Sequence, residues 1–177
     1  SFPTRRSSDL VLYDRDRDDR AAIASGIASK RGATLVPPYD DPLVIAGQGT
    51  AGREIAEDMA ALGLTPDIVV APASGGGLIA GVATAVKAKY PQAQVIVAEP
   101  AGYDDHALSL KVGHREAHAV APRTICDALM AMMPGELTFA INSKLLANGV
   151  NASDEEVGAA VAFAYRELKL VVRSEEH

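Results

Sequence analysis

Three consecutive glycines at the junction of an apolar run and an amphipathic run are the stretch with the clearest capacity for chemistry. Ser74, Gly75, Gly76, Gly77 and Leu78 lie between "DIVVAP" and the run that continues to Tyr90. Glycine loses more backbone freedom on folding than any other residue, so three in series need a reason. A buried strand, a glycine-rich turn and a helix N-terminus bind anions, because backbone N–H groups converge at the positive end of the helix dipole. The stretch therefore predicts a phosphate site, with a flexible strand–helix turn as the alternative.

A cluster of acidic residues follows the next apolar run, "QVIVAEP". Glu99, Asp104 and Asp105 lie within one short loop, and oxygen ligands grouped in this way suit Mg²⁺ or Ca²⁺. The alternative is a solvated acidic loop in which Asp104 caps the following helix. The neighbouring His106 is expected to be a surface or capping residue, and Cys126 a small buried hydrophobe.

A second glycine pattern lies upstream. Residues 47–52, "GQGTAG", match the dinucleotide-binding pattern G-x-G-x-x-G, which indicates such a site only after a strand and before a helix. The helix is expected, but the preceding strand would be only "LVIA". Asp67 also begins the next strand, where an acid is needed at its end. These features disfavour a nicotinamide or flavin site.

The surrounding pattern predicts strands alternating with helices, and therefore an α/β fold with a parallel twisted sheet flanked by helices. Ser153 and Glu156 form the sequence pattern of a capping box at the last helix. Apolar runs predict the strands at residues 11–13, 33–38, 67–72 and 94–100, the third of them buried on both faces. Periodicity and end signals predict the helices at residues 16–32, 40–63, 78–90, 134–149 and 153–170, with another that ends near Gly113.

Composition narrows the classes of function. The chain has 177 residues, 48% of them hydrophobic, with a formal net charge of −6. The acidic balance and the lack of a basic stripe disfavour nucleic acid as a partner. No apolar run is long enough to span a bilayer, which disfavours a membrane protein. A single cysteine and the lack of a secretory signal pattern favour a reducing, cytoplasmic location.

Six motifs, in this order, resemble the fold-type II pyridoxal-phosphate enzymes, in particular the threonine/serine dehydratase and serine racemase group. The resemblance extends from Val11 to Val172, and its motifs are "DDPLVIAGQGT", "SGGGLIAG", "VAEPAGYDD", "TICDAL", "PGELTF" and "RELKLVV". It implies an enzyme that eliminates water and ammonia from serine, threonine or 3-hydroxyaspartate to give a 2-keto acid. Ala128 departs from the family pattern, which usually has glycine there, near the cofactor.

The resemblance also implies roles for the two sites. In that family the glycine loop holds the 5′-phosphate of pyridoxal phosphate, a role that falls here on Ser74, Gly75, Gly76, Gly77 and Leu78. In the racemase-like members a divalent cation binds at positions that match Glu99, the backbone carbonyl of Tyr103, and Asp105. The open alternatives are a serine racemase, a non-catalytic domain that binds a phosphate ligand, and a nicotinamide-binding protein that uses "GQGTAG".

An organisation of the whole protein follows from the same resemblance. Residues 11–46 match the end of a small domain and the segment that returns the chain to the large domain. Residues 47–172 match most of that large, cofactor-binding domain. Residues 1–10 and 173–177 read as foreign or disordered tails. The parent protein is expected to be a homodimer that acts on a small amino acid.

No residue of this chain is expected to be catalytic. The family's lysine that binds the cofactor covalently belongs to a segment before Val11, so we expect an internal fragment that is inactive alone. None of the six lysines matches that lysine's motif: Lys30, Lys87, Lys89, Lys111, Lys144 and Lys169.

Overall fold

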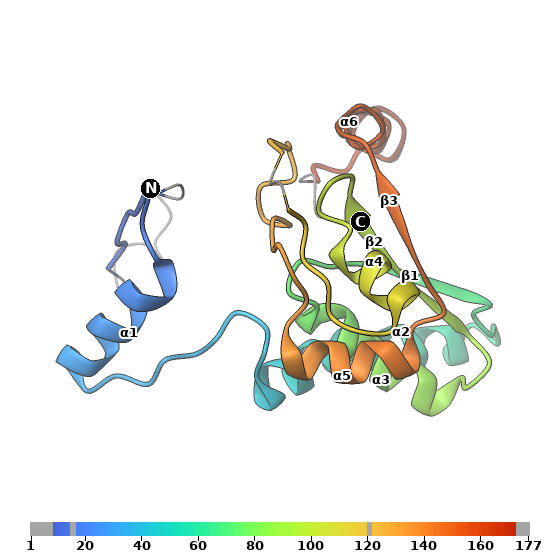
Figure 1. Cartoon of the computed structure of the whole chain (residues 1–177). Coiled ribbons are helices and arrows are strands. Elements are labelled where there is room, and N and C mark those ends of the chain that lie inside the picture. The colour runs from blue at the N-terminus through green and yellow to red at the C-terminus, as the bar shows by residue number, and fades with distance from the viewer. Residues whose placement is uncertain (1–8, 15–16, 120–121, 173–177) are drawn as a thin grey trace. The chain divides into compact units, whose positions relative to one another are not determined.

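The chain divides into two units, shown in a computed structural model that describes residues 9–14, 17–119 and 122–172 (Figure 1). The first unit, Ser1–Val36, contains α1 (Arg20–Arg31). The second unit is Pro37–His177. In chain order it contains α2 (Pro42–Ala61), β1 (Ile68–Pro72), α3 (Gly77–Lys89), β2 (Gln94–Pro100), α4 (Asp105–Val112), α5 (Glu136–Leu145), β3 (Asn148–Ala152), α6 (Asp154–Phe163) and the π-helix η2 (Ala164–Leu168).

Helix α1 ends at Gly32 as its sequence predicts, but it begins at Arg20, four residues after the predicted start at residue 16. The Asp19 side chain accepts hydrogen bonds from the N–H groups of Ala21 and Ala22, and Gly32 ends the helix in the left-handed conformation. The strands predicted at residues 11–13 and 33–38 are wrong. Neither segment pairs with a strand within the described residues, and an apolar run without a partner has no ladder to join.

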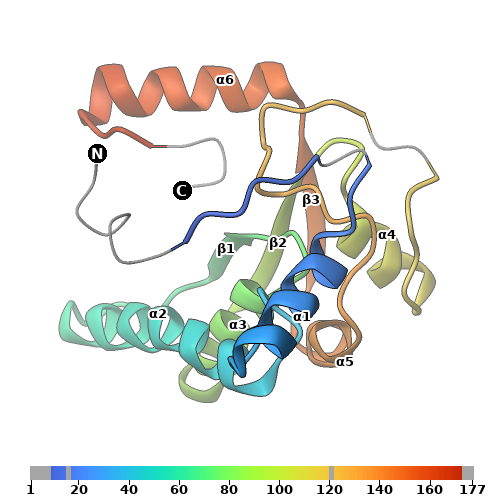
Figure 2. The same ribbon diagram turned by 90° about the vertical axis from the view of Figure 1, so that its left-hand side faces the viewer.

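A parallel three-stranded sheet organises the second unit, which confirms the predicted α/β class. The strand order is β1-β2-β3, with Val70 opposite Ile96 and Ala98 opposite Val150. Figures 1 and 2 show α2, α3 and α5 on one side of this sheet and α6 on the other. The carboxyl ends of all three strands therefore lie at one edge.

The core of the unit lies between the sheet and α3. Val95 and Val97 of β2 and Ile79 and Val86 of α3 are fully buried there. The prediction that the 67–72 strand is buried on both faces is wrong, because Ile68 and Val70 of β1 remain 55% and 53% exposed. Their strand is at the edge of the sheet, and the helices of the core cover its other face.

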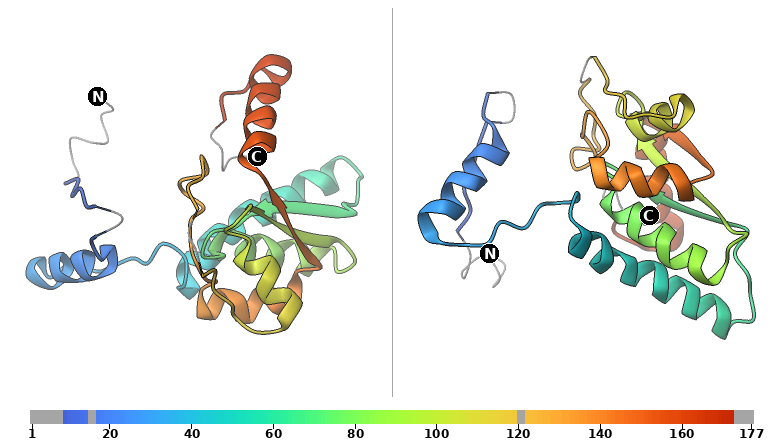
Figure 3. Two further views of the ribbon diagram at one scale, coloured as in Figure 1. Left: turned by 45° about the horizontal axis from the view of Figure 1, so that its top comes forward. Right: turned by 60° about the horizontal axis from the view of Figure 1, so that its bottom comes forward.

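The upstream glycine pattern lies wholly inside α2, so "GQGTAG" follows no strand and forms no nucleotide-binding turn. Its glycines bring α2 against α3, which run side by side in Figure 3. A Cβ at Gly52 would lie 2.7 Å from the Cα of Val82, and a Cβ at Gly81 would lie 2.5 Å from the N of Gly49. The pattern therefore serves close helix packing.

The domain boundary expected at residues 46 and 47 stays a prediction about the whole protein, and both residues lie within α2 here.

The C-terminal part contains one strand that the sequence analysis missed. The helix predicted at 134–149 ends at Leu145, and residues 148–152 form β3 instead. The capping box at Ser153 and Glu156 is confirmed, with both of its hydrogen bonds present. Among the described residues, no helix combines the length and the apolar character needed to cross a lipid bilayer.

Candidate functional site

Both predicted sites follow the carboxyl ends of neighbouring strands. The glycine loop follows β1, and the acidic loop follows β2. Ligands of parallel α/β sheets bind at this edge, because the strand ends open there into loops and helix N-termini. The sheet thus brings the two predicted sites to one edge.

The carbonyl groups of the glycine loop are held from one side. Gly75 O accepts hydrogen bonds from Gly135 N at 3.1 Å and from the Thr138 hydroxyl at 2.6 Å. Gly76 O accepts a hydrogen bond from the Asn142 side-chain amide at 3.3 Å. It also accepts the first helical hydrogen bond of α3, from Ala80 N at 3.0 Å. Thr138 and Asn142 are both buried in α5, so α5 fixes the orientation of two successive peptide groups.

The amide groups of the loop consequently face the other way. In a trans peptide the C=O of one residue and the N–H of the next point in opposite directions, and no described peptide bond is cis. The N–H groups of Gly76 and Gly77 therefore point away from α5. Within the described part of the chain, no N–H of residues 74–78 donates to a protein acceptor. The N–H groups of Gly76 and Gly77, together with the other unpaired amides at the start of α3, are donors that would suit a phosphate group; we call residues 74–78 the cradle.

Close neighbours explain why this loop contains glycine. A Cβ at Gly75 would collide with the ring of Tyr39. Gly76 adopts φ +92°, and a Cβ there would collide with Nε2 of His106 and lie 2.9 Å from the Asn142 amide nitrogen. No other residue type would leave the loop backbone in this position.

Ser74 stands where the family pattern often has a fourth glycine. Its hydroxyl oxygen accepts a hydrogen bond from Ala131 N at 3.1 Å. The serine therefore ties the start of the cradle to the segment before α5 while its backbone N–H remains unpaired.

The acidic cluster is buried. Glu99 is 3% exposed, and its carboxylate accepts hydrogen bonds from the backbone N–H groups of His106 and Ala107, each at 2.9 Å. Asp105 is fully buried, and neither of its carboxylate oxygens has a hydrogen-bond partner. Burial, followed by the charge of Glu99, raises the pKa of Asp105 to about 8. A carboxylate in this position would be stabilised by a nearby cation.

His106 is the residue that sequence reasoning placed wrongly. It was expected at the surface, but its side chain is fully buried, and its ring lies with Glu99 and Asp105 in one group whose ligand atoms are within 4.8 Å of one another. In the alternative interpretation Asp104 caps α4; Asp104 is indeed the N-cap residue, but its side chain makes no capping hydrogen bond, and the Glu99 carboxylate accepts from N–H groups of the first turn instead. The useful signal was the position of a histidine directly after two acids at a buried strand end.

The backbone around Tyr103 is held by its own contacts. Its N–H donates to Pro100 O at 2.9 Å, and its hydroxyl donates to Pro122 O at 2.8 Å. The ring, 1% exposed, anchors the acidic loop to the segment that follows α4. These contacts fix the loop that contains the Tyr103 carbonyl, which is the third expected ligand of the divalent cation.

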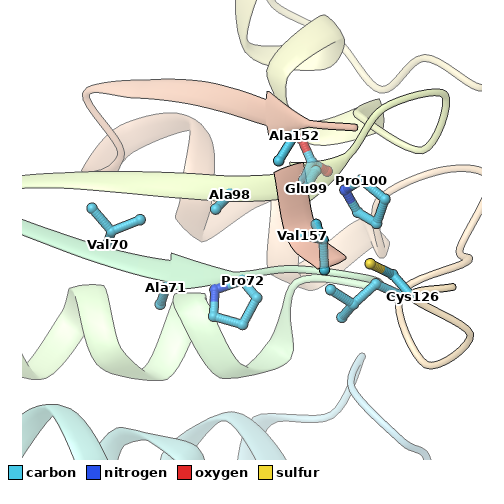
Figure 4. A pocket seen from close by; sticks show the side chains of 10 residues that line it. Val70, Ala71, Pro72, Ala98, Glu99, Pro100, Cys126, Ala152 and Val157 are labelled. Atoms are coloured by element: carbon cyan, nitrogen blue, oxygen red, sulfur yellow. The ribbon is translucent and has the colours of Figure 1, made fainter. Parts of the chain in front are cut away.

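A small apolar pocket of about 180 Å³ completes this edge of the sheet (Figure 4). Pro72, Ala98 and Val157 line it together with Cys126, which is 1% exposed, as predicted. Ala128 is exposed and does not line the pocket. An apolar pocket at the strand ends is suited to the flat, uncharged part of a ligand.

Known proteins are similar to this chain in both sequence and fold. The family model "Pyridoxal-phosphate dependent enzyme" matches residues 7–175. The chain is 37% identical to the L-threonine ammonia-lyase of Thermotoga maritima, in an alignment that covers 92% of this chain. It is 34% identical to the L-threo-3-hydroxyaspartate ammonia-lyase of Saccharomyces cerevisiae, again over 92% of this chain. The structure of maize serine racemase superimposes with a TM-score of 0.85 at 31% identity, over 94% of this chain.

The matches cover only part of each relative. The chain spans 39% of the Thermotoga protein, 48% of the yeast protein and 49% of the maize chain. It therefore corresponds to about half or less of the length of these relatives.

Proposed function

Because the chain belongs to the family of pyridoxal-phosphate dependent enzymes, we propose that it supplies the phosphate site of an ammonia-lyase acting on a β-hydroxy amino acid. Serine, threonine or 3-hydroxyaspartate would lose water across its α- and β-carbons, and the resulting enamine would take up water and release ammonia to give a 2-keto acid. Residues 47–172 would form part of the cofactor domain of a longer, homodimeric cytoplasmic protein. In this proposal none of the six lysines anchors the cofactor, so this chain alone does not turn over substrate.

The unpaired amides of residues 74–78 carry this proposal. They would bind the three phosphate oxygens without any side-chain charge, and the positive end of the 13-residue α3 would add to the attraction. Pyridoxal phosphate, when bound, withdraws electrons from the α-carbon of an amino acid. The contribution of this chain would be to orient that group: Thr138 and Asn142 hold the two peptide groups whose N–H donors belong to Gly76 and Gly77.

The acidic cluster supports a second part of the proposal, a structural divalent cation. Mg²⁺ or Ca²⁺ would bind to oxygens of Glu99 and Asp105 and to the Tyr103 carbonyl. The unpartnered Asp105 carboxylate is the observation that favours it, because an ion would compensate its buried charge. The same cluster favours a serine racemase as the second candidate function, in view of the likeness to the maize enzyme.

Phosphate binding can be tested without interference from lysine chemistry. Pyridoxine 5′-phosphate has no aldehyde, so it cannot react with surface amines. We expect it and inorganic phosphate to raise the melting temperature of the 177-residue chain by an amount that grows with the ratio of ligand concentration to Kd, while pyridoxine at the same concentration does not. Equal shifts with pyridoxine and its phosphate would contradict the proposed cradle, and a larger shift with NAD would favour the nicotinamide alternative.

Asp105 should make the stability of the metal-free chain depend on pH. Its folded pKa of about 8 lies above its ordinary value of 3.8, so the folded state binds more protons between these values. The free energy of unfolding therefore falls as the pH rises through this window, by at most about 1.4 kcal/mol per pH unit. Urea titrations in EDTA at pH 5, 6, 7 and 8 should show this fall.

Two variants isolate the source of that slope. Asp105→Asn should lose it, and should also lose any stabilisation by Mg²⁺ at pH 8. Asp58→Asn, which changes an exposed aspartate of α2, should keep both. An unchanged slope in Asp105→Asn would show that other groups cause the pH dependence.

A further inference from the structure

His106 lies between the two proposed binding sites and contacts both. Its Nδ1 is 3.3 Å from Glu99 Oε1 and 3.6 Å from Asp105 Oδ2, in neither case with hydrogen-bond geometry. Its Nε2 faces Gly76, at the position that a Cβ of that residue would occupy. One imidazole ring thus touches the acidic cluster with one nitrogen and the phosphate loop with the other.

Both ring nitrogens are buried without a hydrogen-bond partner, and both oxygens of Asp105 share this state. Buried polar atoms without partners are costly, and they are rare in folded proteins. The two unpartnered oxygens of Asp105, beside the two partnered oxygens of Glu99, indicate that a positively charged ligand belongs there. The two unpartnered ring nitrogens are a separate observation: the ring is held between the acidic cluster and the glycine loop by packing and not by hydrogen bonds.

We infer that His106 couples the two sites, so that a divalent cation at Glu99 and Asp105 and a phosphate at the glycine loop strengthen each other's binding. This inference rests on the proposed function. His106 acts as a positioning residue and touches neither the reacting atoms nor, in this account, the cation itself.

The rigidity of the ring gives the coupling a physical basis. A cation would draw the oxygens of Glu99 and Asp105 together, and the imidazole edge packed against them would have to follow. Because the ring is planar and stiff, its other edge would move against Gly76, a residue of the loop whose amides would bind the phosphate. Phosphate on those amides would hold the same ring position from the other side. Linkage requires the effect to be reciprocal.

Two substitutions divide the function of the ring. His106→Asn keeps an amide near the place of Nδ1 and withdraws from Gly76. His106→Gln reaches toward Gly76 and lacks the group beside Glu99. His114→Asn is the matched control, because that histidine is 66% exposed and lies outside both sites. Circular dichroism would verify that each variant is folded.

The experiment measures the affinity of the full chain for Mg²⁺ and for pyridoxine 5′-phosphate by calorimetry, each alone and with the other at saturation. We expect each ligand to tighten the other by about fivefold or more in the parent and in His114→Asn, within the usual range of coupling between sites. In a folded His106→Asn or His106→Gln variant, both ligands should bind alone and tighten each other less than about twofold.

Other outcomes would overturn the inference in different ways. If the parent binds both ligands without mutual tightening, or if the His106 variants keep it, the coupling does not depend on this ring. Loss of Mg²⁺ binding in both His106 variants would make the histidine a ligand instead. A parent that binds pyridoxine 5′-phosphate but no Mg²⁺ overturns this inference alone, whereas a parent that does not bind the phosphate compound overturns the proposed function.

Discussion

Gly76→Ala is expected to abolish binding of pyridoxine 5′-phosphate and to lower the free energy of unfolding by about 3 kcal/mol or more. The left-handed conformation at φ +92° costs an alanine roughly 1–2 kcal/mol. The added methyl group must also displace His106 and Asn142, which are both fully buried, and overpacking of this kind costs about 1–3 kcal/mol. Calorimetry and urea denaturation measure the two effects separately.

Ser74→Ala is the matched control within the same loop. It removes the hydroxyl that accepts from Ala131 N and leaves every loop amide in place. We expect it to lose about 1 kcal/mol of stability and to bind the phosphate compound nearly as tightly as the parent. If Gly76→Ala were as stable and as competent in binding as Ser74→Ala, the geometry described for the cradle would be wrong.

Gly81→Ala is expected to have the second largest effect, on stability but not on ligand affinity. A Cβ at this position would collide with the Ile45 carbonyl and lie 2.5 Å from the N of Gly49, and these are backbone atoms of a helix that cannot move aside singly. Separation of α2 from α3 should cost at least about 2 kcal/mol and lower the melting temperature by roughly 4–8 °C. The N–H groups of the cradle are unchanged, so the folded fraction should retain its affinity for phosphate.

Gly158→Ala distinguishes packing from the intrinsic effect of replacing glycine. Gly158 lies inside α6 with nothing near the place of a Cβ, and alanine favours the helix by about 1 kcal/mol. This variant should therefore gain stability. A gain in Gly81→Ala as well would show that the two helices are not in the close contact described here.

Sequence patterns predicted those elements that signal their own ends. Gly32 ends α1, and Ser153 with Glu156 begins α6, because caps are local hydrogen bonds between near neighbours. The start of α1 was predicted too early, because several acids precede the helix and Asp19 is the one that caps it. Strand β3 was missed since "NGVNA" has a single large apolar residue, and it is a strand only because β2 lies beside it. The segment at 33–38 failed for the opposite reason: it has the composition of a strand but no partner in the described chain.

The same distinction applies to the site. The phosphate loop was predictable, because its glycines and its place between strand and helix are consecutive in the sequence. The surroundings of Gly75 and Gly76 were not, since Tyr39, His106 and Asn142 come from three separate segments. Glu99 and Asp105 were identified from their spacing, but the hydrogen bonds of Glu99 to the start of α4 depend on the angle at which that helix leaves the sheet.

Three side chains from separate segments pack against one short turn: Tyr39 before α2, His106 of α4 and Asn142 of α5. Phosphate affinity should therefore depend on the correct tertiary placement of all three segments. A substitution far from the turn that loosens any one of these three supports would register as weaker anion capture before the protein visibly melts. Titration with a single small ion could thus report the placement of these three side chains, although it would not detect a change such as Gly81→Ala that leaves them in place.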